Sequence, residues 1–166
     1  MAEREIKMAI RQILKLGLDG EEALSKKCKP VGAMTERMQN VLEDLIDTLY
    51  ESGGVGLAAP QVGILRRMAV IDIGDGLIVL IDPEIIKEEG KQTGTEGCLS
   101  YPEHWGIVTR PNRVTVRAAD EEGNVREITG EGLLARAFCH EIEHLDGHMF
   151  TEKVEEWVNP EEILGE

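Results

Sequence analysis

The chain has 166 residues, of which 42% are hydrophobic and 30% charged, and its formal net charge is −14. This length suits one domain with a sizeable core, so we expect residues 1–166 to form a single domain. The acidic balance argues against direct nucleic-acid binding and against an anionic membrane surface, since both partners favour clustered Lys and Arg. The sequence has no run of roughly eighteen apolar residues and no apolar signal core at its start, which predicts a cytoplasmic protein without a membrane span.

The first half of the chain predicts one long amphipathic helix. An apolar segment, 6–16, comes first. Thr35 is then suited to be a helix N-cap, because its hydroxyl can accept a hydrogen bond from a free backbone N–H of the first turn. Apolar residues recur at helical spacing from Met38 to Leu49, and Gly53 is a natural stop.

The middle of the chain predicts strands. Extended runs are expected at 67–73, 77–81, 85–88, 113–119 and 125–128. Asp75-Gly76 marks a turn between the first two runs, and the last two flank Glu122-Gly123-Asn124 as a hairpin. Because the runs form hairpins and do not alternate with helices, the predicted class is α+β with mainly antiparallel sheet.

A second helix is predicted from Leu133, since neither Gly nor Pro occurs before Gly147. Apolar residues lie on nearly all of its faces, which is typical of a buried helix. Asp146-Gly147 supplies its stop.

This helix carries the motif His140-Glu141-Ile142-Glu143-His144, which is H-E-x-x-H. Residues four apart share a helix face, so the two imidazoles can hold one divalent cation, with Glu141 beside it. Five residues of this kind also occur by chance in helices with unrelated histidines. The buried setting favours a metal, because an unpaired buried polar group costs about 1–3 kcal/mol.

A catalytic site of this type usually has three protein ligands and one open position. With a downstream carboxylate, Glu161 or Glu162, as third ligand, the chain would be an H-E-x-x-H metallopeptidase. Both residues lie in an acidic tail, whose composition is typical of solvated surface. The thiolate of Cys98 is the stronger candidate, because sulfur with two imidazoles suits Zn²⁺ or Fe²⁺. A closed structural site with Cys139 as fourth ligand is a further alternative. We expect Cys139 to pack in the core instead, since its side chain points about 100° away from that of His140.

The segment 54–61, Gly-Val-Gly-Leu-Ala-Ala-Pro-Gln, could be mistaken for a phosphate-binding loop. It lacks the third Gly of a dinucleotide site and the Lys-Ser/Thr of a P-loop. Its glycines allow close approach of a ligand or of another part of the chain, and a tight turn in the core is the plainer interpretation.

Three segments, G-V-G-L-A-A-P-Q (54–61), E-G-C-L-S (96–100) and H-E-I-E-H-L-D-G (140–147), resemble the signature motifs of the peptide deformylase family. The resemblance runs from about Met8 to about Phe150. It implies antiparallel sheets packed around a central buried metal-binding helix. It also implies a hydrolase that removes the N-formyl group from the formyl-methionine of nascent polypeptides and releases formate.

The resemblance carries residue roles with it. Cys98, His140 and His144 correspond to the metal ligands, and Glu141 to the general base that later acts as an acid. The cation implied is Fe²⁺ in the cell, with Zn²⁺, Ni²⁺ or Co²⁺ as substitutes.

Further roles concern the substrate. Gln61 and the backbone N–H of Leu99 correspond to the groups that stabilise the oxyanion, while Val55 and Gly56 line a cleft that pairs with an extended peptide. Glu96 resembles a carboxylate that lies behind a metal ligand. Val55 and Ile142 are candidates for the methionine side-chain pocket.

Some positions depart from the family pattern or are variable in it. Glu143 replaces the usual Asp and is expected to orient a neighbouring ligand or to hold a loop by a salt bridge, while Tyr101, His104 and Trp105 are expected to form a cleft wall. Residues 1–7 form an extension, so Met8 is a candidate natural start. The acidic tail, 152–166, lacks the basic helix that some members use to dock on the ribosome, which leaves at most transient ribosome contact.

Overall fold

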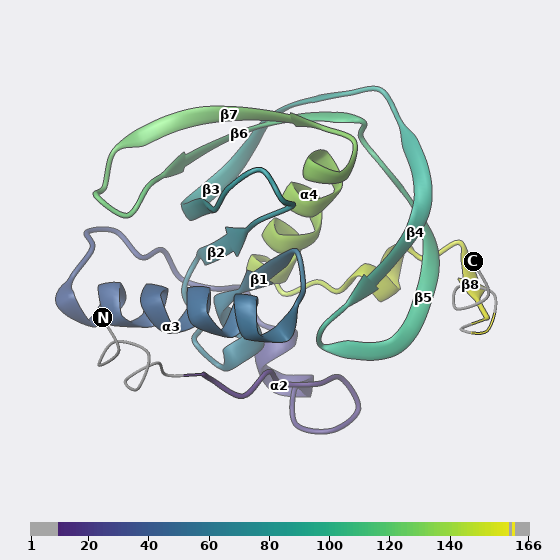
Figure 1. Ribbon diagram of the computed structural model, residues 1–166, viewed down its shortest axis with the longest axis horizontal. Coiled ribbons are helices and arrows are strands. Elements are labelled where there is room, and N and C mark those ends of the chain that lie inside the picture. Colours follow the sequence, from purple (N-terminus) through teal and green to yellow (C-terminus); the bar gives the residue numbers. More distant parts are fainter. Residues whose placement is uncertain (1–9, 160, 162–166) are drawn as a thin grey trace.

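The computed structural model describes residues 10–159 and residue 161. Helix α4 (Leu133–Leu145) lies in the middle of the molecule, with β-sheet on either side of it (Figure 1). The predicted α+β class with antiparallel sheets is confirmed. The extension 1–7, Met8 and Glu162 lie outside the described residues.

The strands of the described residues form two antiparallel sheets. The first has the order β1-β2-β3-β6-β7, with β1 Gly56–Ala58, β2 Met68–Ile71, β3 Ile78–Glu89, β6 Arg113–Ala119 and β7 Val125–Glu131. The second has the order β4-β5-β8, with β4 Gln92–Cys98, β5 Tyr101–Arg110 and β8 Glu156–Val158. Strands β1 and β4 therefore each lie at the edge of a sheet, and they carry residues of the first two motifs.

Helix α3 (Glu36–Ser52) confirms the predicted amphipathic helix. The Thr35 hydroxyl accepts a hydrogen bond from the Met38 N–H at 3.2 Å, and Gly53 ends the helix in the left-handed conformation with φ 75°. Its apolar face packs on β1 and β2, where Leu45 and Leu49 are fully buried. The other helices within residues 10–159 are short: α2 Glu21–Leu24, η1 Ala59–Val62 and η2 Phe150–Lys153.

The end of helix α4 lies where the sequence predicted it. Asp146 caps the helix, and Gly147 follows with φ 84°. Arg67 donates hydrogen bonds to the Leu145 carbonyl and to Asp146 Oδ1, each at 2.9 Å. A cation at this end of a helix also complements the helix dipole. The chain is thus held firmly just after the H-E-x-x-H motif.

Two expectations about the strands need correction. The runs 77–81 and 85–88 are parts of one strand, β3, whose pairing with β6 is irregular next to Asp82, where φ is 52°. The segment Glu96–Cys98, which lies outside the predicted strands, is the end of strand β4, with a register shift between Glu96 and Cys98. Glycines at 94 and 97 lower the strand propensity that would have marked β4 in the sequence.

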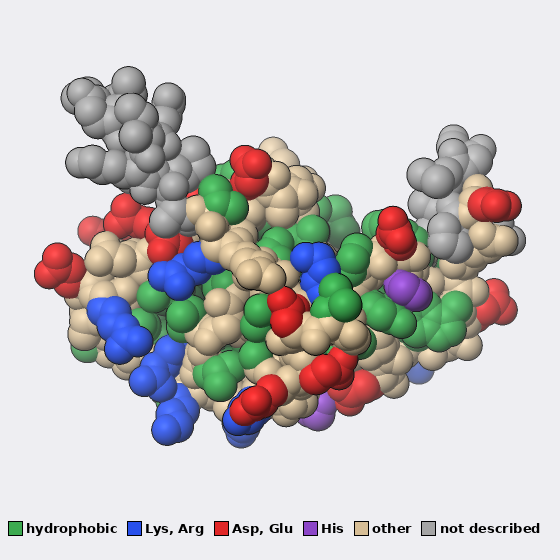
Figure 2. All heavy atoms as spheres, turned by 90° about the horizontal axis from the view of Figure 1, so that it is seen from below, with side chains coloured by type: hydrophobic (Ala, Val, Ile, Leu, Met, Phe, Trp, Pro, Cys, Tyr) green, Lys and Arg blue, Asp and Glu red, His purple; other side chains and the backbone are tan. Residues whose placement is uncertain are grey.

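The surface is of mixed character. Among residues 10–159 and 161, no helix is both long and apolar enough to cross a membrane. On the face shown in Figure 2, acidic and basic side chains are interspersed with hydrophobic ones.

Candidate active site

Three candidate ligands converge from two elements. Cys98 comes from the end of β4, and His140 and His144 from successive turns of α4. Their ligand atoms all lie within 4.8 Å of one another, and Cys98 Sγ is 3.3 Å from His144 Nε2. Within the part of the chain that the structure describes, this is the sole group of three or more His, Cys, Asp or Glu side chains so arranged. The cysteine upstream therefore lies beside the two histidines of the motif.

These residues fit a divalent cation. One sulfur and two imidazole nitrogens are a donor set that suits Zn²⁺ or Fe²⁺. Burial, and next the proximity of His140, lowers the pKa of His144 well below its usual value, so its ring is neutral as a ligand must be. Glu141 Oε1 is buried and accepts no hydrogen bond from the described residues. A cation between the three ligands would give this carboxylate a positive neighbour.

Glu141 itself is a buried acid. Its side chain is 3% exposed, and burial raises its pKa to about 7. A carboxyl with a pKa near neutrality can both take and return a proton at physiological pH.

The carboxylate of Glu96 lies behind the first histidine. Its Oε1 lies 2.6 Å from His140 Nδ1 and accepts a hydrogen bond from Arg110 Nη2 at 2.6 Å. Its Oε2 accepts a hydrogen bond from Arg136 Nη1 at 2.7 Å. Burial alone would raise the pKa of Glu96, but the hydrogen bonds with His140 and Arg110 hold it well below its usual range. The carboxylate therefore stays ionised and accepts a hydrogen bond from the His140 ring.

Glu143 makes the salt bridge that was one of its two expected roles. Its carboxylate lies 2.6 Å from Arg110 Nη1 and 3.5 Å from Lys153 Nζ, so it ties α4 to β5 and η2. It does not orient the neighbouring ligand directly, because His144 Nδ1 has no hydrogen-bond partner among the described residues.

The Gln61 side chain is fixed by two neighbours. Its Oε1 accepts from the Ala58 N–H at 2.9 Å, and its Nε2 donates to Ser100 Oγ at 3.1 Å. The same Nε2 lies 3.7 Å from Cys98 Sγ. Because the oxygen is already engaged by the backbone, the amide NH₂ must face the cluster of candidate ligands.

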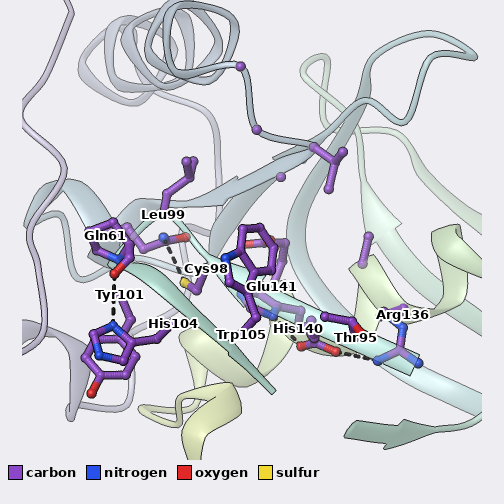
Figure 3. A pocket seen from close by; sticks show the side chains of 18 of the residues that line it. Gln61, Thr95, Cys98, Leu99, Tyr101, His104, Trp105, Arg136, His140 and Glu141 are labelled. Carbon is purple, nitrogen blue, oxygen red and sulfur yellow. Dashed lines mark hydrogen bonds and ion pairs between the residues drawn. The ribbon is translucent and has the colours of Figure 1, made fainter. Parts of the chain in front are cut away.

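A cavity of about 480 Å³ opens beside the cluster (Figure 3). Its lining includes Val55, Gly56, Tyr101, His104 and Trp105, together with Gln61, Cys98, Leu99, Leu133, Arg136, Ala137, His140 and Glu141. The Tyr101 and His104 rings stack with their centroids 3.9 Å apart, so the expected cleft wall is confirmed. Ile142 is not among the lining residues; it packs in the apolar cluster around Phe138.

The rival ligands lie elsewhere. Cys139 is 4% exposed and belongs to the same apolar cluster as Phe138, as expected of a packing residue. Burial raises the pKa of its thiol to about 11, so it is not a thiolate at neutral pH. Glu161 is exposed and takes no part in the Cys98–His140–His144 group.

Two buried arginines were not found from the sequence. Arg110 is 2% and Arg136 is 7% exposed, and both donate hydrogen bonds to the Glu96 carboxylate. The sequence did contain a sign of the role of Arg136. An arginine within an otherwise apolar, buried helix requires a buried acidic partner.

An α+β fold in which a cluster of one cysteine and two histidines lies beside a cavity with a buried glutamate is typical of a metal-dependent hydrolase. Residues 10–159 match the model of the polypeptide deformylase family, and the chain belongs to that family.

Relatives agree over nearly the whole chain. A peptide deformylase of Caldanaerobacter subterraneus subsp. tengcongensis is 55% identical over 158 residues, which are 95% of this chain and 98% of that protein. The crystal structure of peptide deformylase from Thermotoga maritima has a TM-score of 0.83 at 37% identity, and the match covers 87% of this chain and 97% of that one. A Met-Ala-Ser-bound class I type b peptide deformylase from Acinetobacter baumannii has a TM-score of 0.81 at 28% identity, with coverage of 88% and 99%.

Proposed function

We propose that this protein acts in the cytoplasm as one catalytic domain that removes the N-formyl group from the formyl-methionine of nascent polypeptides. The observation that carries the proposal is the grouping of Cys98, His140 and His144 beside a cavity whose lining includes the buried Glu141. Membership of the deformylase family supports the choice of substrate over the peptide bonds that a metallopeptidase cuts.

Cys98, His140 and His144 are the metal ligands in this proposal. The cation is Fe²⁺ in the cell, and Zn²⁺, Ni²⁺ or Co²⁺ can replace it, since all four accept a sulfur and two imidazoles. When bound, it activates a water molecule and polarises the formyl carbonyl.

Glu141 handles the protons. It takes one from the attacking water and later gives it to the leaving nitrogen, so that the C–N bond breaks and formate and a free amine result. Its raised pKa of about 7 supports this double role, because a group of that pKa is readily protonated and deprotonated at neutral pH.

Gln61 and the backbone N–H of Leu99 stabilise the oxyanion that forms at the formyl oxygen. The orientation of the Gln61 amide supports its part, since its oxygen is held by Ala58 and its NH₂ is directed toward Cys98. Preorganised donors of this kind lower the barrier without reorganising during the reaction.

Val55 and Gly56 bind the peptide, which adds to the open edge of β1 as a further strand. Val55 is 43% exposed, directly before this edge strand, and both residues line the cavity. The Acinetobacter baumannii relative whose printed title names bound Met-Ala-Ser supports a methionyl peptide as occupant of this cleft.

The test is formate release from formyl-Met-Ala-Ser by protein loaded anaerobically with Fe²⁺, Ni²⁺ or Zn²⁺ in turn. Acetyl-Met-Ala-Ser serves as the control for the formyl group. We expect formate from the formyl peptide and little turnover of the acetyl peptide. Cleavage of internal peptide bonds without formate would instead support the metallopeptidase alternative.

A further inference from the structure

Arg136 is a buried cation that no step of the proposed reaction uses. It lies on α4 one turn before His140, and its side chain is 9% exposed. Its Nη1 donates to Glu96 Oε2 at 2.7 Å and to the Val108 carbonyl at 3.2 Å. A Cβ at Gly94 would lie only 3.3 Å from its Nη2, so strand β4 leaves little more room than the guanidinium needs. Burial of such a group is costly unless it is paired and hydrogen-bonded, and its partner here is Glu96.

Glu96 is not neutralised by Arg110 alone. Arg110 donates from Nε and Nη2 to Glu96, but its Nη1 donates to Glu143 at 2.6 Å. One guanidinium thus faces two carboxylates, and Lys153, the other cation near Glu143, is 52% exposed. Arg136 supplies the second buried positive charge. The cluster of Glu96, Glu143, Arg110 and Arg136 therefore has no formal net charge.

The carboxylate that Arg136 holds is the one that orients a ligand. Arg136 binds Oε2 of Glu96, while His140, four residues later on the same helix, binds Oε1 at 2.6 Å (Figure 3). An ionised Glu96 accepts a hydrogen bond from Nδ1 of His140, so Nε2 is the ring nitrogen that would bind a cation. If the Glu96 carboxylate turned, both contacts from α4 would be broken.

We propose that Arg136 is a positioning residue of the metal centre: by holding Glu96, it fixes the ring orientation and tautomer of His140 that bind the cation. This inference rests on the proposed metal site. It differs from a purely structural ion pair, because it requires the affinity for the cation to depend on Arg136, in addition to any effect on stability.

The first test compares three variants in anaerobic titrations of Co²⁺ against a competing chelator, with the Co²⁺ absorption spectrum and thermal unfolding recorded alongside. We expect Arg136→Met to weaken Co²⁺ binding by about tenfold or more and to alter the spectrum. Arg136→Lys keeps the charge and should recover part of the loss. Arg117→Met is the matched control, since Arg117 forms surface ion pairs with Glu84 and Glu127. Unchanged Co²⁺ affinity and spectrum in Arg136→Met would overturn the inference, whatever happens to its melting temperature.

The second test asks whether Arg136 acts through Glu96. In a Glu96→Gln background, Arg136→Met should weaken Co²⁺ binding by less than threefold, because the Glu96 carboxylate that Arg136 binds is already absent. Full additivity of the two losses in Co²⁺ affinity would overturn the inference.

Formate release is measured separately. A wild type that binds Co²⁺ with Arg136-dependent affinity but releases no formate under any metal would refute the proposed function and leave this inference standing. A wild type that binds no Co²⁺ would overturn it.

Discussion

The carboxylate of Glu141 lies directly against the backbone of Gly56. A Cβ at position 56 would come within 2.5 Å of Glu141 Oε2 and 3.0 Å of its Cδ. Gly56 also pairs with Ile71 in the antiparallel β1–β2 ladder, so its backbone cannot easily move away. The missing side chain at position 56 thus sets where the proposed base can lie.

Substitution of Gly56 by Ala should therefore impair turnover more than folding. The new methyl group must displace the Glu141 carboxylate, and a shift of about 1 Å in a catalytic group can cost on the order of 10²-fold in rate. We expect kcat on formyl-Met-Ala-Ser to fall by about that factor, while bound metal, measured by elemental analysis, stays at the wild-type level. A Gly56→Ala variant with wild-type kcat would contradict this relationship.

Removal of the Glu141 charge should stabilise the cation-free protein at high pH. Burial raises the pKa of this carboxyl from 4.5 to about 7, so the folded state holds the proton over a range where the unfolded chain has lost it. Stability is therefore lost as pH rises from about 4.5 through 7, by about 3 kcal/mol in all. Glu141→Gln has no charge to bury.

Thermal unfolding of chelator-treated protein checks this expectation. The variant should melt close to the wild type at pH 5 and several degrees higher at pH 8, at the cost of nearly all turnover. A difference in melting temperature that is the same at both pH values would show that the carboxyl titrates normally.

The two cysteines near the motif should behave in opposite ways. Cys98→Ala removes the proposed sulfur ligand and should abolish stable metal binding. Cys139→Ala should keep the metal, because the Cys139 thiol, with its pKa near 11, packs among apolar side chains. It should lower stability by about 1 kcal/mol through the small cavity it leaves. Metal retained in Cys98→Ala would instead favour a downstream carboxylate as third ligand.

The helices could be predicted from the sequence because their signals are local. Thr35 and Gly53 mark the ends of α3, and Asp146 marks the end of α4, by capping chemistry that each residue carries itself. Strand β4 was missed because it holds two glycines and a register shift, and its pairing with β5 supplies what its sequence does not. The continuity of β3 was hidden because Asp82 and Pro83, both of low strand propensity, interrupt its sequence.

In the candidate site, too, the residues within local motifs could be predicted, and the contacts that depend on tertiary packing could not. Cys98, His140 and His144 were recognised from their motifs and indeed lie together. The partners of Glu96 were not predictable from spacing, because Arg110 lies 14 and Arg136 lies 40 residues away from it in the sequence. Their meeting depends on the register of β4 with β5 and on the rotation of α4, which only the packed structure fixes.

The Gln61 amide offers a prediction that separates chemistry from packing. Gln61→Glu keeps an oxygen to accept from Ala58 but replaces the NH₂ that faces Cys98 with a second acceptor. Loss of one oxyanion donor typically costs about 10²–10³ in kcat. We expect a fall of that order on formyl-Met-Ala-Ser, with little change in bound metal. Gln39→Glu, at a half-buried position of α3 where the amide donates to the Glu121 carbonyl, introduces the same charge away from the cavity and should leave kcat unchanged. If both variants kept the wild-type kcat, Gln61 would be a packing residue and the oxyanion would depend on other donors.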